Sequence, residues 1–426
     1  MITISIIVLW FVLLFMGVQL YVSLGLVSLI GLILSDVSLT NVVNKLYHSI
    51  DSFPLLAVPI FILAGELMND GTITKRLVIF SKTLLGHITG GLAHVNVGAN
   101  VIMSGVSGSA LAEAAGIGKV IIPAMIKAKY NPSWTACLTA TTSVLGPLIP
   151  PSIPLVIYAV MASVSAGAMM LAGTLPGLLV AAILMIYIYW YCKKTKTDIP
   201  KSKFKLSRLW KGFKIGFLSL MSTVIIIAGI ITGAFTPTEA AAATVVYVLI
   251  VAGLVYRKLG WLELKNSFIN SAQMTSSVMI TLTSAAVFNY YLTMQGVPQL
   301  LSEYLVSVTN SPSNLLLLLS VLVIFLGCFL DGLAIMLLVV PVFLPAALAA
   351  GIDPIHFGVV LVLCMMTGLI TPPFGPSLFL VSKISGVEFN VLAKQIGPWL
   401  ICLIISIIIC IYVPWLSTWL PQILLD

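Results

Sequence analysis

Long apolar stretches separated by short polar turns make up most of the chain, and their lengths predict helices that cross or enter a membrane. Residues 1–34 are apolar and long enough for a tilted crossing and a turn back, and residues 53–68 form a second apolar block. One crossing needs about 20 predominantly apolar residues. The stretch that follows intersperses apolar residues with Lys75, Arg76 and Lys82, which predicts an amphipathic helix along the membrane interface.

Two later segments consist of apolar arms around a turn rich in small residues. In residues 94–125 the turn is SGVSGS, from Ser104 to Ser109, and its glycines and serines favour exposed backbone over helix. Each arm has only about 15 residues, fewer than the roughly 20 of a full crossing. Residues 314–348 show the same pattern around residues 327–332. Both patterns predict a re-entrant helical hairpin that enters and leaves the membrane on the same side.

A proline-rich apolar segment follows each predicted hairpin. SVLGPLIPPSIPLVIY, from Ser143 to Tyr158, carries four prolines, and TGLITPPFGPSLFL, from Thr367 to Leu380, carries three. Each proline inside a helix removes a backbone hydrogen bond and costs about 3 kcal/mol. The two segments are therefore predicted to be apolar helices that break near their middle.

The two units, each a hairpin and a broken helix, match one another at a separation of 222 positions, as in 372 − 150 = 222. No gap is needed across either unit. Matched interruptions in the two halves of a chain are typical of secondary transporters built as inverted repeats. The matched positions are Pro150, Pro151 and Pro154 with Pro372, Pro373 and Pro376, Gly146 with Gly368, Pro123 with Pro345, and Ser109 with Asp331.

The broken segments are also candidate cation sites. Irregular backbone at membrane depth is tolerated only where protein or a water-filled cavity satisfies it. Unwound carbonyls then become cation ligands, while helix N-termini face anions. Residues 143–152, with serine hydroxyls of the SGVSGS turn, are expected to hold a small cation, most simply Na⁺; residues 327–332 and 367–373 are expected to hold another. The alternative is a pair of proline kinks that only shape packing.

Composition places the chain in a membrane. Of its 426 residues, 60% are hydrophobic and 8% are charged, whereas soluble domains carry about 25% charged residues. We expect an all-α polytopic membrane protein with about 10–12 transmembrane segments, the two hairpins included. The N-terminal apolar stretch is expected to be an uncleaved first helix. The six cysteines and four histidines show no metal-ligand or redox spacing.

Positive charge is concentrated in one predicted loop. Residues 192–214 hold nine of the 21 lysines and arginines, which in a membrane protein indicates a cytoplasmic loop rather than nucleic-acid binding. Two crossings later, Arg257, Lys258 and Lys265 are expected on the same side. Between these crossings FTPTEAAAA predicts a helix start capped by Thr238.

Few acidic residues fall within the apolar segments. A charge at the bilayer centre costs at least about 2.5 kcal/mol, so it usually marks function. Asp331, in the second hairpin turn, is the strongest polar candidate. Glu113, just after the first turn, fits either a functional role or a cap of its own hairpin arm. Glu66 is expected at the interface.

Several motifs together resemble the large membrane subunit of the tripartite ATP-independent periplasmic (TRAP) transporters. They are SGVSGSALAEAAGIGKVIIPAM, LGPLIPPSIPLVIY, FTPTEAAA, TGLITPPFGP and, near the start, PLLAVPIFILAGELMNDG. The likeness covers nearly the whole chain, in order. It implies an elevator-type transporter of the bacterial cytoplasmic (inner) membrane, in which a scaffold stays fixed while both hairpins and both broken helices carry substrate across.

The resemblance further implies Na⁺-coupled uptake of an organic acid anion, such as a sialic acid or a C4-dicarboxylate, with no cofactor besides Na⁺ as coupling ion and no enzymatic activity. The implied partners are a soluble periplasmic substrate-binding protein and a small four-helix membrane subunit. That subunit is expected as a separate chain, because the sequence begins directly with its own first span.

The resemblance and the repeat also imply particular site residues, many acting through backbone carbonyls. Lys119 falls within the first hairpin arm, where an uncharged residue is expected, so the arm either ends earlier or lets Lys119 reach the interface. The implied residues are Ser107, Ser109, Gly146, Ile149 and Pro151 for a first Na⁺ site; Gly327, Phe329, Asp331, Gly368, Thr371 and Pro373 for a second; and Ser104, Ser109, Ser152 and Asp331 for substrate.

The predicted organisation has five parts. N-terminal scaffold helices and an interfacial arm occupy residues 1–87, transport segments occupy 88–165 and 313–386, further scaffold helices occupy 166–292, and a C-terminal helix occupies 387–426. The alternatives are an ion channel, against which no filter sequence or charged stripe is found, and a proton-coupled organic anion transporter. HExxH and P-loop motifs of membrane enzymes and ATP-driven pumps are absent from the sequence.

Overall fold

The structure, a computed structural model, describes residues 2–70, 73–195, 206–257, 259–309 and 311–425. Within these ranges all regular elements are helices, which confirms the predicted all-α class. Part of the predicted basic loop, residues 196–205, lies outside the described residues.

The first half of the chain ends with α11. Its helices are α1 (Ile2–Phe15), α2 (Leu20–Leu34), α3 (Leu39–Ile50), η1 (Phe53–Leu56), α4 (Ala57–Asp70), α5 (Ile73–Leu85), α6 (Gly91–Ser107), α7 (Ala110–Lys127), α8 (Pro132–Thr142), η2 (Ser143–Leu145), α9 (Ile153–Met161), α10 (Ala166–Ala172) and α11 (Thr174–Lys194).

The second half begins with α12. Its helices are α12 (Leu206–Ile231), α13 (Pro237–Leu249), the π-helical turn η3 (Ile250–Val255), α14 (Trp261–Met294), α15 (Val297–Val308), α16 (Pro312–Gly327), α17 (Gly332–Ala349), α18 (Pro354–Gly368), α19 (Pro376–Ser385), α20 (Phe389–Gln395), α21 (Gly397–Tyr412) and α22 (Trp415–Leu425).

Helix boundaries in the two halves follow the offset found in the sequence. The second hairpin arms, α7 and α17, have 18 residues each and start 222 positions apart. The helices after them, α8 and α18, both begin with a proline in the first turn, and the side chains of Asn131 and Asp353 cap them. Two hairpins, α6–α7 and α16–α17, each followed by an interrupted helix, are therefore present as predicted.

The repeat also extends beyond the predicted units. After the broken segments the offset becomes 223: α10 and α20 start at Ala166 and Phe389, and α11 and α21 at Thr174 and Gly397. Towards the N-terminus, α3 and α14 start 222 positions apart, at Leu39 and Trp261. The pair differs in shape, because the first-half helix bends by 59° between α3 and α4 whereas α14 runs through 34 residues.

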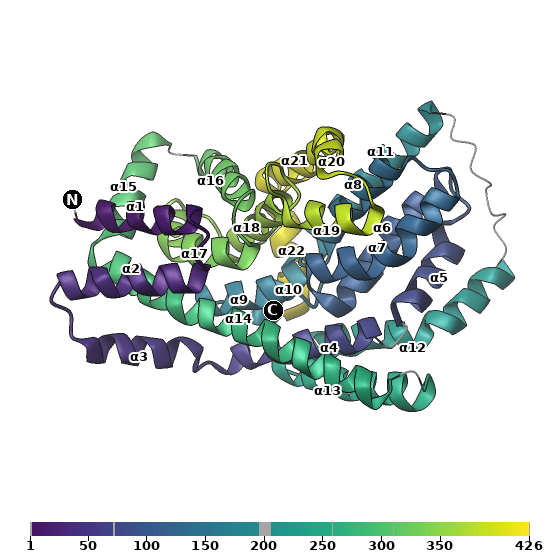
Figure 1. Ribbon diagram of the computed structural model, residues 1–426, viewed down its shortest axis with the longest axis horizontal. Coiled ribbons are helices and arrows are strands. Elements are labelled where there is room, and N and C mark those ends of the chain that lie inside the picture. Colours follow the sequence, from purple (N-terminus) through teal and green to yellow (C-terminus); the bar gives the residue numbers. More distant parts are fainter. Residues whose placement is uncertain (1, 71–72, 196–205, 258, 310, 426) are drawn as a thin grey trace.

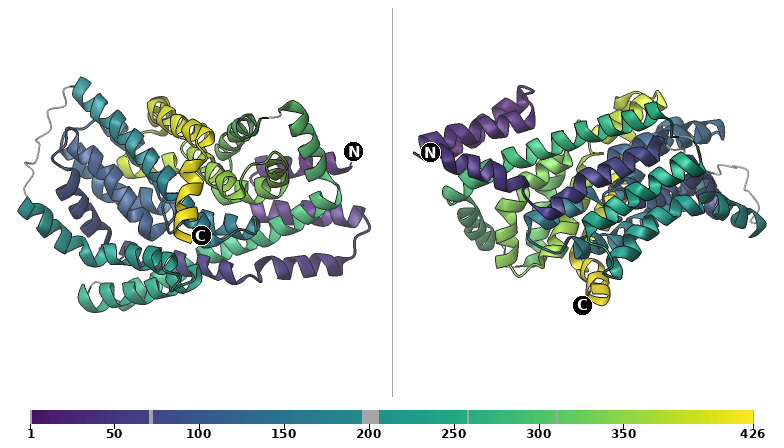
Figure 2. Two further views of the ribbon diagram at one scale, coloured as in Figure 1. Left: turned by 180° about the vertical axis from the view of Figure 1, so that it is seen from behind. Right: turned by 90° about the horizontal axis from the view of Figure 1, so that it is seen from below.

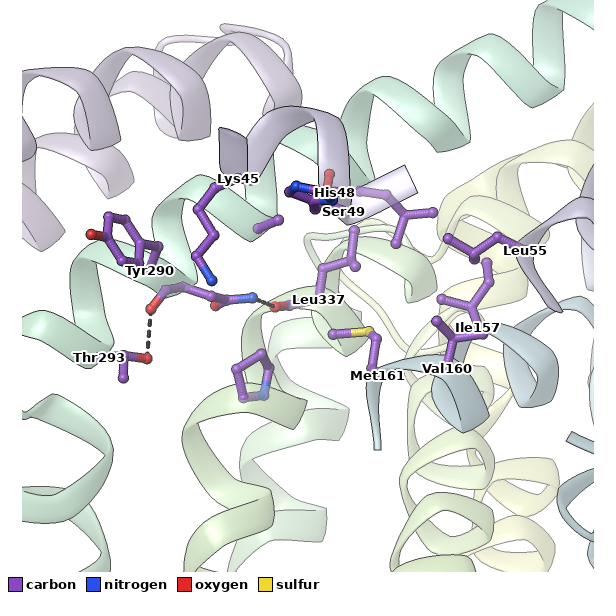
Figure 3. Close-up of a pocket in the computed structure, with 14 residues that line it drawn as sticks. Lys45, His48, Ser49, Leu55, Ile157, Val160, Met161, Tyr290, Thr293 and Leu337 are labelled. Carbon is purple, nitrogen blue, oxygen red and sulfur yellow. Dashed lines mark hydrogen bonds between the residues drawn. The ribbon is translucent and has the colours of Figure 1, made fainter. Parts of the chain in front are cut away.

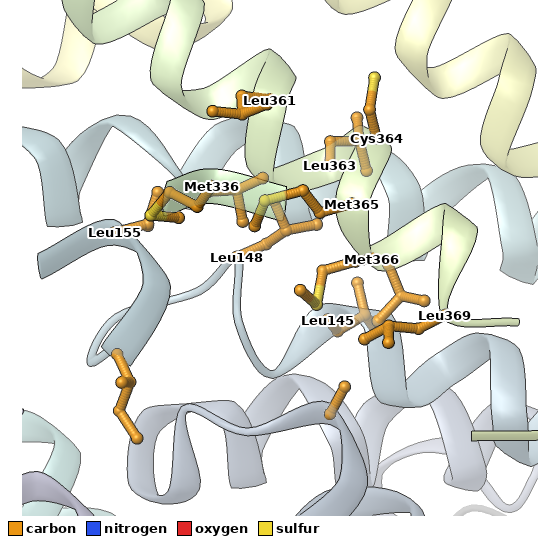
Figure 4. Close-up of a cluster of buried hydrophobic side chains, with 14 of the residues drawn as sticks. Leu145, Leu148, Leu155, Met336, Leu361, Leu363, Cys364, Met365, Met366 and Leu369 are labelled. Carbon is orange, nitrogen blue, oxygen red and sulfur yellow. The ribbon is translucent and has the colours of Figure 1, made fainter. Parts of the chain in front are cut away.

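The hairpins lie at opposite ends of the molecule, with the broken helices between them. In Figures 1 and 2, α6 and α7 lie at the end where α11 finishes and α12 starts, and α16 and α17 lie at the other end. The long helices α12, α13 and α14 run along one side with α4. At the centre, Leu148, Met336 and Met365 are fully buried between the two broken helices and the second hairpin (Figure 4).

By length and hydropathy alone, four described helices are long enough to cross a membrane, and two bent helix pairs would raise the number to six. Hairpin arms and half-helices are mostly shorter than this test requires. Shorter apolar helices, such as Leu20–Leu34 and Pro354–Gly368, come in addition. The polytopic architecture is clear from these segments, and the number of 10–12 stays a prediction.

One local expectation is wrong, and one of the two alternatives for Lys119 is excluded. Thr236, not Thr238, caps α13: its hydroxyl accepts from Glu239 N, and the Glu239 carboxylate accepts from Thr236 N at 2.8 Å, which completes a capping box. Pro237 then takes the first helical position, so Thr238 lies inside the helix. Lys119 does not end its hairpin arm either, because α7 continues to Lys127 and the Lys119 side chain is exposed.

Candidate functional site: two hairpin tips against two broken helices

The first hairpin tip touches the first broken helix. Gly108 ends α6 with φ +57, and the Ser109 hydroxyl caps α7 by accepting from Ala112 N. A Cβ atom on Gly108 would lie 2.7 Å from the carbonyl oxygen of Pro151. Only glycine fits here, since both the positive φ and the close approach exclude a side chain.

The prolines leave particular carbonyls of the broken segment free. In a helix each carbonyl accepts from the N–H four residues later, so the prolines at 147, 150, 151 and 154 remove the donors for the carbonyls of 143, 146, 147 and 150. The Gly146 N–H donates to Ser143 O instead, and the Ser152 hydroxyl donates to Pro147 O. Within the described chain no backbone N–H donates to Gly146 O or Pro150 O. Both oxygens are available as cation ligands.

A buried carboxylate lies against the backbone of Gly146 in this broken segment. Glu113 is fully buried, and its Oε1 accepts a hydrogen bond from the Ser107 hydroxyl across the hairpin tip at 3.0 Å. Among the described residues its Oε2 has no hydrogen-bond partner. A Cβ on Gly146 would lie 2.6–2.9 Å from the three carboxyl atoms of Glu113, so the carboxylate rests directly on that glycine. An ionised carboxylate in such a place requires a compensating charge.

The structure thus brings together most of the first predicted Na⁺ site. Ser107 and Gly146 meet at Glu113, and Pro151 lies against the hairpin tip. Ile149 is buried, with its side chain packed on Gly177. These placements suit the predicted ligand set, whose assignment to Na⁺ stays a prediction.

Sequence reasoning did not include Glu113 in this set. The side-chain cap of α7 is Ser109, so the alternative role considered for Glu113, a cap of its own arm, is filled by another residue. The sequence did carry one signal for this role: Glu113 is the fourth residue of α7, in the turn next to the hairpin tip, and from there its side chain can reach the end of α6.

The second predicted site is more open than the first. A Cβ on Gly327 would lie 2.7 Å from Gly368 Cα, so the backbones of α16 and α18 touch there. The Thr371 hydroxyl donates to Thr367 O at 2.8 Å, and Pro373 is exposed. The Phe329 ring, 40% exposed, contacts Phe374 at a centroid distance of 5.6 Å.

The two sites also differ in charge. The position 222 residues after Glu113 holds Ile335, which is fully buried. The carboxylate of the second half is instead Asp331, at the tip itself, where it caps α17 by accepting from Leu333 N at 3.2 Å. Each half therefore supplies one acidic residue close to its hairpin tip, in a different position.

A cavity of about 210 Å³ lies between the two tips and the scaffold helices. Ser109 and Asp331 line it from the tips, and Met274 and Ser277 line it from α14. The helices α7, α9 and α17 all begin at this cavity, so three helix N-termini with partial positive charge border it. We call it the central cavity.

Not every predicted substrate residue faces this space. Ser104 is fully buried and donates to Val101 O at 2.6 Å; Ser152 is fully buried, donates to Pro147 O and caps α9. Both hydroxyls stabilise their own segments. Ser109 and Asp331 remain the predicted substrate contacts that the cavity exposes.

Beneath the first site, buried polar side chains connect α6 to α8. Asn96 Nδ2 donates to Thr139 Oγ1 at 2.7 Å, and Asn100 Nδ2 donates to Thr142 Oγ1 at 2.9 Å. All four side chains are fully buried. The corresponding positions of the second half are Leu318, Leu322, Leu361 and Cys364. At these four positions the first repeat is therefore polar where the second carries leucine and cysteine.

Comparison with known proteins agrees with this architecture. The sequence matches the family described as "Tripartite ATP-independent periplasmic transporter, DctM component" over residues 7–416. It is 42% identical over 421 residues to the sialic acid TRAP transporter large permease protein SiaM of Vibrio cholerae, which covers 98% of this chain and 97% of that protein. It is 36% identical over 402 residues, 94% of each chain, to the C4-dicarboxylate TRAP transporter large permease protein DctM of Pseudomonas aeruginosa.

Among solved structures, the YdaH transporter of Alcanivorax borkumensis has a similar fold. The TM-score is 0.65, the sequence identity is 15%, and 90% of each chain is covered. At this identity the likeness concerns the fold alone. Both of these relatives, SiaM and DctM, are named permeases of transport systems, not enzymes. The chain therefore belongs to the DctM-component family of tripartite ATP-independent periplasmic transporters, as a multi-pass large permease of the bacterial inner membrane.

Proposed function

We propose that this chain imports an organic acid anion of the sialic acid or C4-dicarboxylate type, coupled to Na⁺. The substrate class follows the names of the relatives, which include permeases for both kinds of acid. The N-termini of α7 and α9 at the central cavity suit a carboxylate, because backbone N–H groups and the helix dipole favour anions, whereas Asp331 already caps the N-terminus of α17. Delivery of the acid by a periplasmic binding protein and support by a separate small membrane subunit accord with a tripartite system.

The observation that carries the Na⁺ coupling is the Glu113 carboxylate. Glu113 is a fully buried carboxylate that rests on Gly146 and the hydroxyl of Ser107, and one of its oxygens has no partner among the described residues. It therefore offers oxygen ligands and the opposite charge for a small monovalent cation. We assign the first coupling ion to this place, and the second to the free backbone around Gly368 and Thr371.

We further propose an elevator movement in which residues 88–165 and 313–386, here called the transport body, slide against the scaffold. Among the described residues, two side-chain hydrogen bonds to backbone carbonyls join them, besides a longer one of 3.8 Å from the Thr74 hydroxyl to Met103 Sδ. Asn289 of α14 donates to Leu337 O at 3.2 Å, a carbonyl whose helical donor is missing because residue 341 is proline. Thr223 of α12 donates to Gly105 O at 3.0 Å. Both are single bonds that a sliding movement can exchange at small cost.

Uptake into proteoliposomes tests the proposal. The chain is reconstituted with its small subunit and a binding protein, and uptake of labelled N-acetylneuraminate or succinate is compared under inward Na⁺ and inward K⁺ gradients. We expect accumulation only with Na⁺ and the binding protein. Glu113→Gln should raise the Na⁺ concentration for half-maximal uptake about tenfold or more, which corresponds to roughly 1.4 kcal/mol.

The matched control is Glu263→Gln, an exposed acid in the first turn of α14, which should leave the Na⁺ dependence unchanged. If a proton gradient drove uptake equally well without Na⁺, the coupling ion would be H⁺ and not Na⁺. Non-saturable flux without accumulation would indicate a channel instead.

A further inference from the structure

A second cavity, of about 430 Å³, separates α3 and α14 from α9 and α17 (Figure 3). We call it the outer cavity. Part of its wall is apolar, with side chains such as Leu55, Ile157 and Leu282. The remainder is polar and comes from α3 and α14: Lys45, His48, Ser49, Asn289, Tyr290 and Thr293.

The outer cavity lies along the same three helices as the central cavity. On α14, residues 274–278 line the central cavity and residues 282–293 line the outer cavity. At α17 and its cap, residues 331–333 line the central cavity and residues 337–341 line the outer cavity. On α9, residues 153–154 line the central cavity and residues 157–161 line the outer cavity. These shifts amount to about one to three helical turns in each helix. The two cavities therefore lie one after the other along the interface between transport body and scaffold.

Along this interface the outer cavity lies towards the external face. If the basic residues beside α11 and α12 are cytoplasmic, α12 and α13 cross out and back, and α14 starts at the cytoplasmic side and ends outside. The outer cavity is lined by the last third of α14 and by the parts of α9 and α17 farther from the tips. Figure 1 agrees, because α3 lies at the end of the molecule opposite to the junction of α11 and α12.

The charge of the outer cavity suits an anion. Lys45 extends from α3 into it, with Nζ 5.4 Å from the centre of the Tyr290 ring (Figure 3). None of the described lining residues is acidic. Asn289 adds a buried Oδ1 without a described partner, and the Thr293 hydroxyl donates to Asn289 O at 2.8 Å. A lysine ammonium beside an aromatic ring, with no carboxylate opposite it, is free to pair with an incoming anion.

We propose that the outer cavity is a separate binding site for the carboxylate of the transported acid, with Lys45 as its counter-charge, occupied before the acid reaches the central cavity. The proposal rests on the proposed function for the identity of the ligand. Capture of the acid here would raise its local concentration next to the central cavity, where no described lining residue carries a positive charge. Lys45 is thus a substrate-positioning residue on the external side.

Uptake kinetics give the first test. At saturating Na⁺, Lys45→Gln should raise the KM for the transported acid about tenfold and change the maximal rate less than twofold, because only the entry step is weakened. Lys45→Arg should restore most of the affinity. Lys119→Gln, which removes another exposed lysine in a membrane helix, is the matched control and should behave as wild type. An unchanged KM in Lys45→Gln, with active wild-type protein, would overturn the proposal.

A second test works without transport. The permease with its small subunit in lipid nanodiscs is treated with an amine-acetylating reagent, and modification of each lysine is followed by mass spectrometry. N-acetylneuraminate or succinate should slow the modification of Lys45 at least fivefold. Neither acid should change the modification of Lys119, and an uncharged sugar should not change the modification of Lys45. Protection without Na⁺-driven uptake would uphold this site and refute the coupling ion. Absence of protection by both acids would refute the site even if uptake were Na⁺-driven.

Discussion

At the scale of single residues, the second site depends on a contact that only glycine permits. A Cβ on Gly368 would lie 2.5 Å from Gly327 Cα and 3.1 Å from Ile324 O, both backbone atoms that cannot rotate away. In the first half Gly146 meets a side chain, that of Glu113, at the matched position. The matched glycines therefore have different roles: Gly368 lets two helix backbones touch, whereas Gly146 makes room for the Glu113 carboxylate.

Gly368→Ala should consequently destabilise the protein by about 1–3 kcal/mol, the usual cost of overpacking a buried contact. The measurement is the apparent melting temperature of the purified permease in detergent. The control is Gly397→Ala, where nothing lies within 4 Å of the added carbon. Equal melting temperatures for both variants would mean that α16 and α18 are not in close contact.

Residue identity predicted some of this site and left other parts open. The Pro-Pro-x-x-Pro spacing predicted both breaks and which glycines match, because proline acts on the backbone locally. It did not predict that Glu113 reaches Ser107, since that contact depends on how sharply the tip turns at Gly108. Nor did it predict that Ser152 turns inward to satisfy Pro147 O.

At the scale of elements, the repeat is closer in helix length than in side-chain chemistry. The hairpin arms α7 and α17 have equal length, yet the polar contacts between α6 and α8 are replaced by leucine and cysteine between α16 and α18. The bend between α3 and α4 has no counterpart in α14. A constant offset in the sequence shows that the two halves share a helix pattern. A bend, in contrast, depends on a few local residues such as Pro54, which α14 lacks at the matched position.

Asn100→Leu, which introduces the residue of the second repeat, should destabilise the protein by about 1–3 kcal/mol. Thr142 and Asn96 would each lose one buried hydrogen bond while keeping the bond to one another, and each lost bond costs about 0.5–1.5 kcal/mol. Urea- or heat-induced unfolding in detergent measures the change. Asn266→Leu, on an exposed turn of α14, should stay within 0.5 kcal/mol of wild type, roughly the range of surface substitutions. A neutral Asn100→Leu would show that the contacts are exchangeable.

At the scale of the whole molecule, the division into scaffold and transport body stays a prediction. The pairs α14–α17 and α12–α6 are in contact across the predicted boundary. Helix α11, assigned to the scaffold by sequence, packs on α6 of the transport body and on α21. A movement of the hairpins would thus either leave α11 behind or take it along.

Cross-linking tests whether the boundary slides. Cysteines at Asn289 and Leu337, whose Nδ2 and O atoms lie 3.2 Å apart, should form a mercury(II) bridge that lowers uptake at least tenfold and is reversed by thiol. A pair at Phe80 and Phe213, whose rings lie 6.2 Å apart within the predicted scaffold, is the control and should leave uptake intact. Full uptake by the bridged Asn289–Leu337 pair would rule out a slide at this interface.

The placement of one acid in each repeat has a consequence for the membrane voltage. Glu113 and Asp331 both belong to the proposed transport body, so when ionised they move with it. Two bound Na⁺ ions would cancel their charge on the inward journey, leaving only the charge of the acid substrate. In the empty body two uncompensated buried carboxylates would be costly, so each would take up a proton before the return, and they would then add no charge to the returning body. The membrane voltage, worth about 2.3 kcal/mol per charge per 100 mV, would thus act on the charge of the cargo and not on the reset of the carrier.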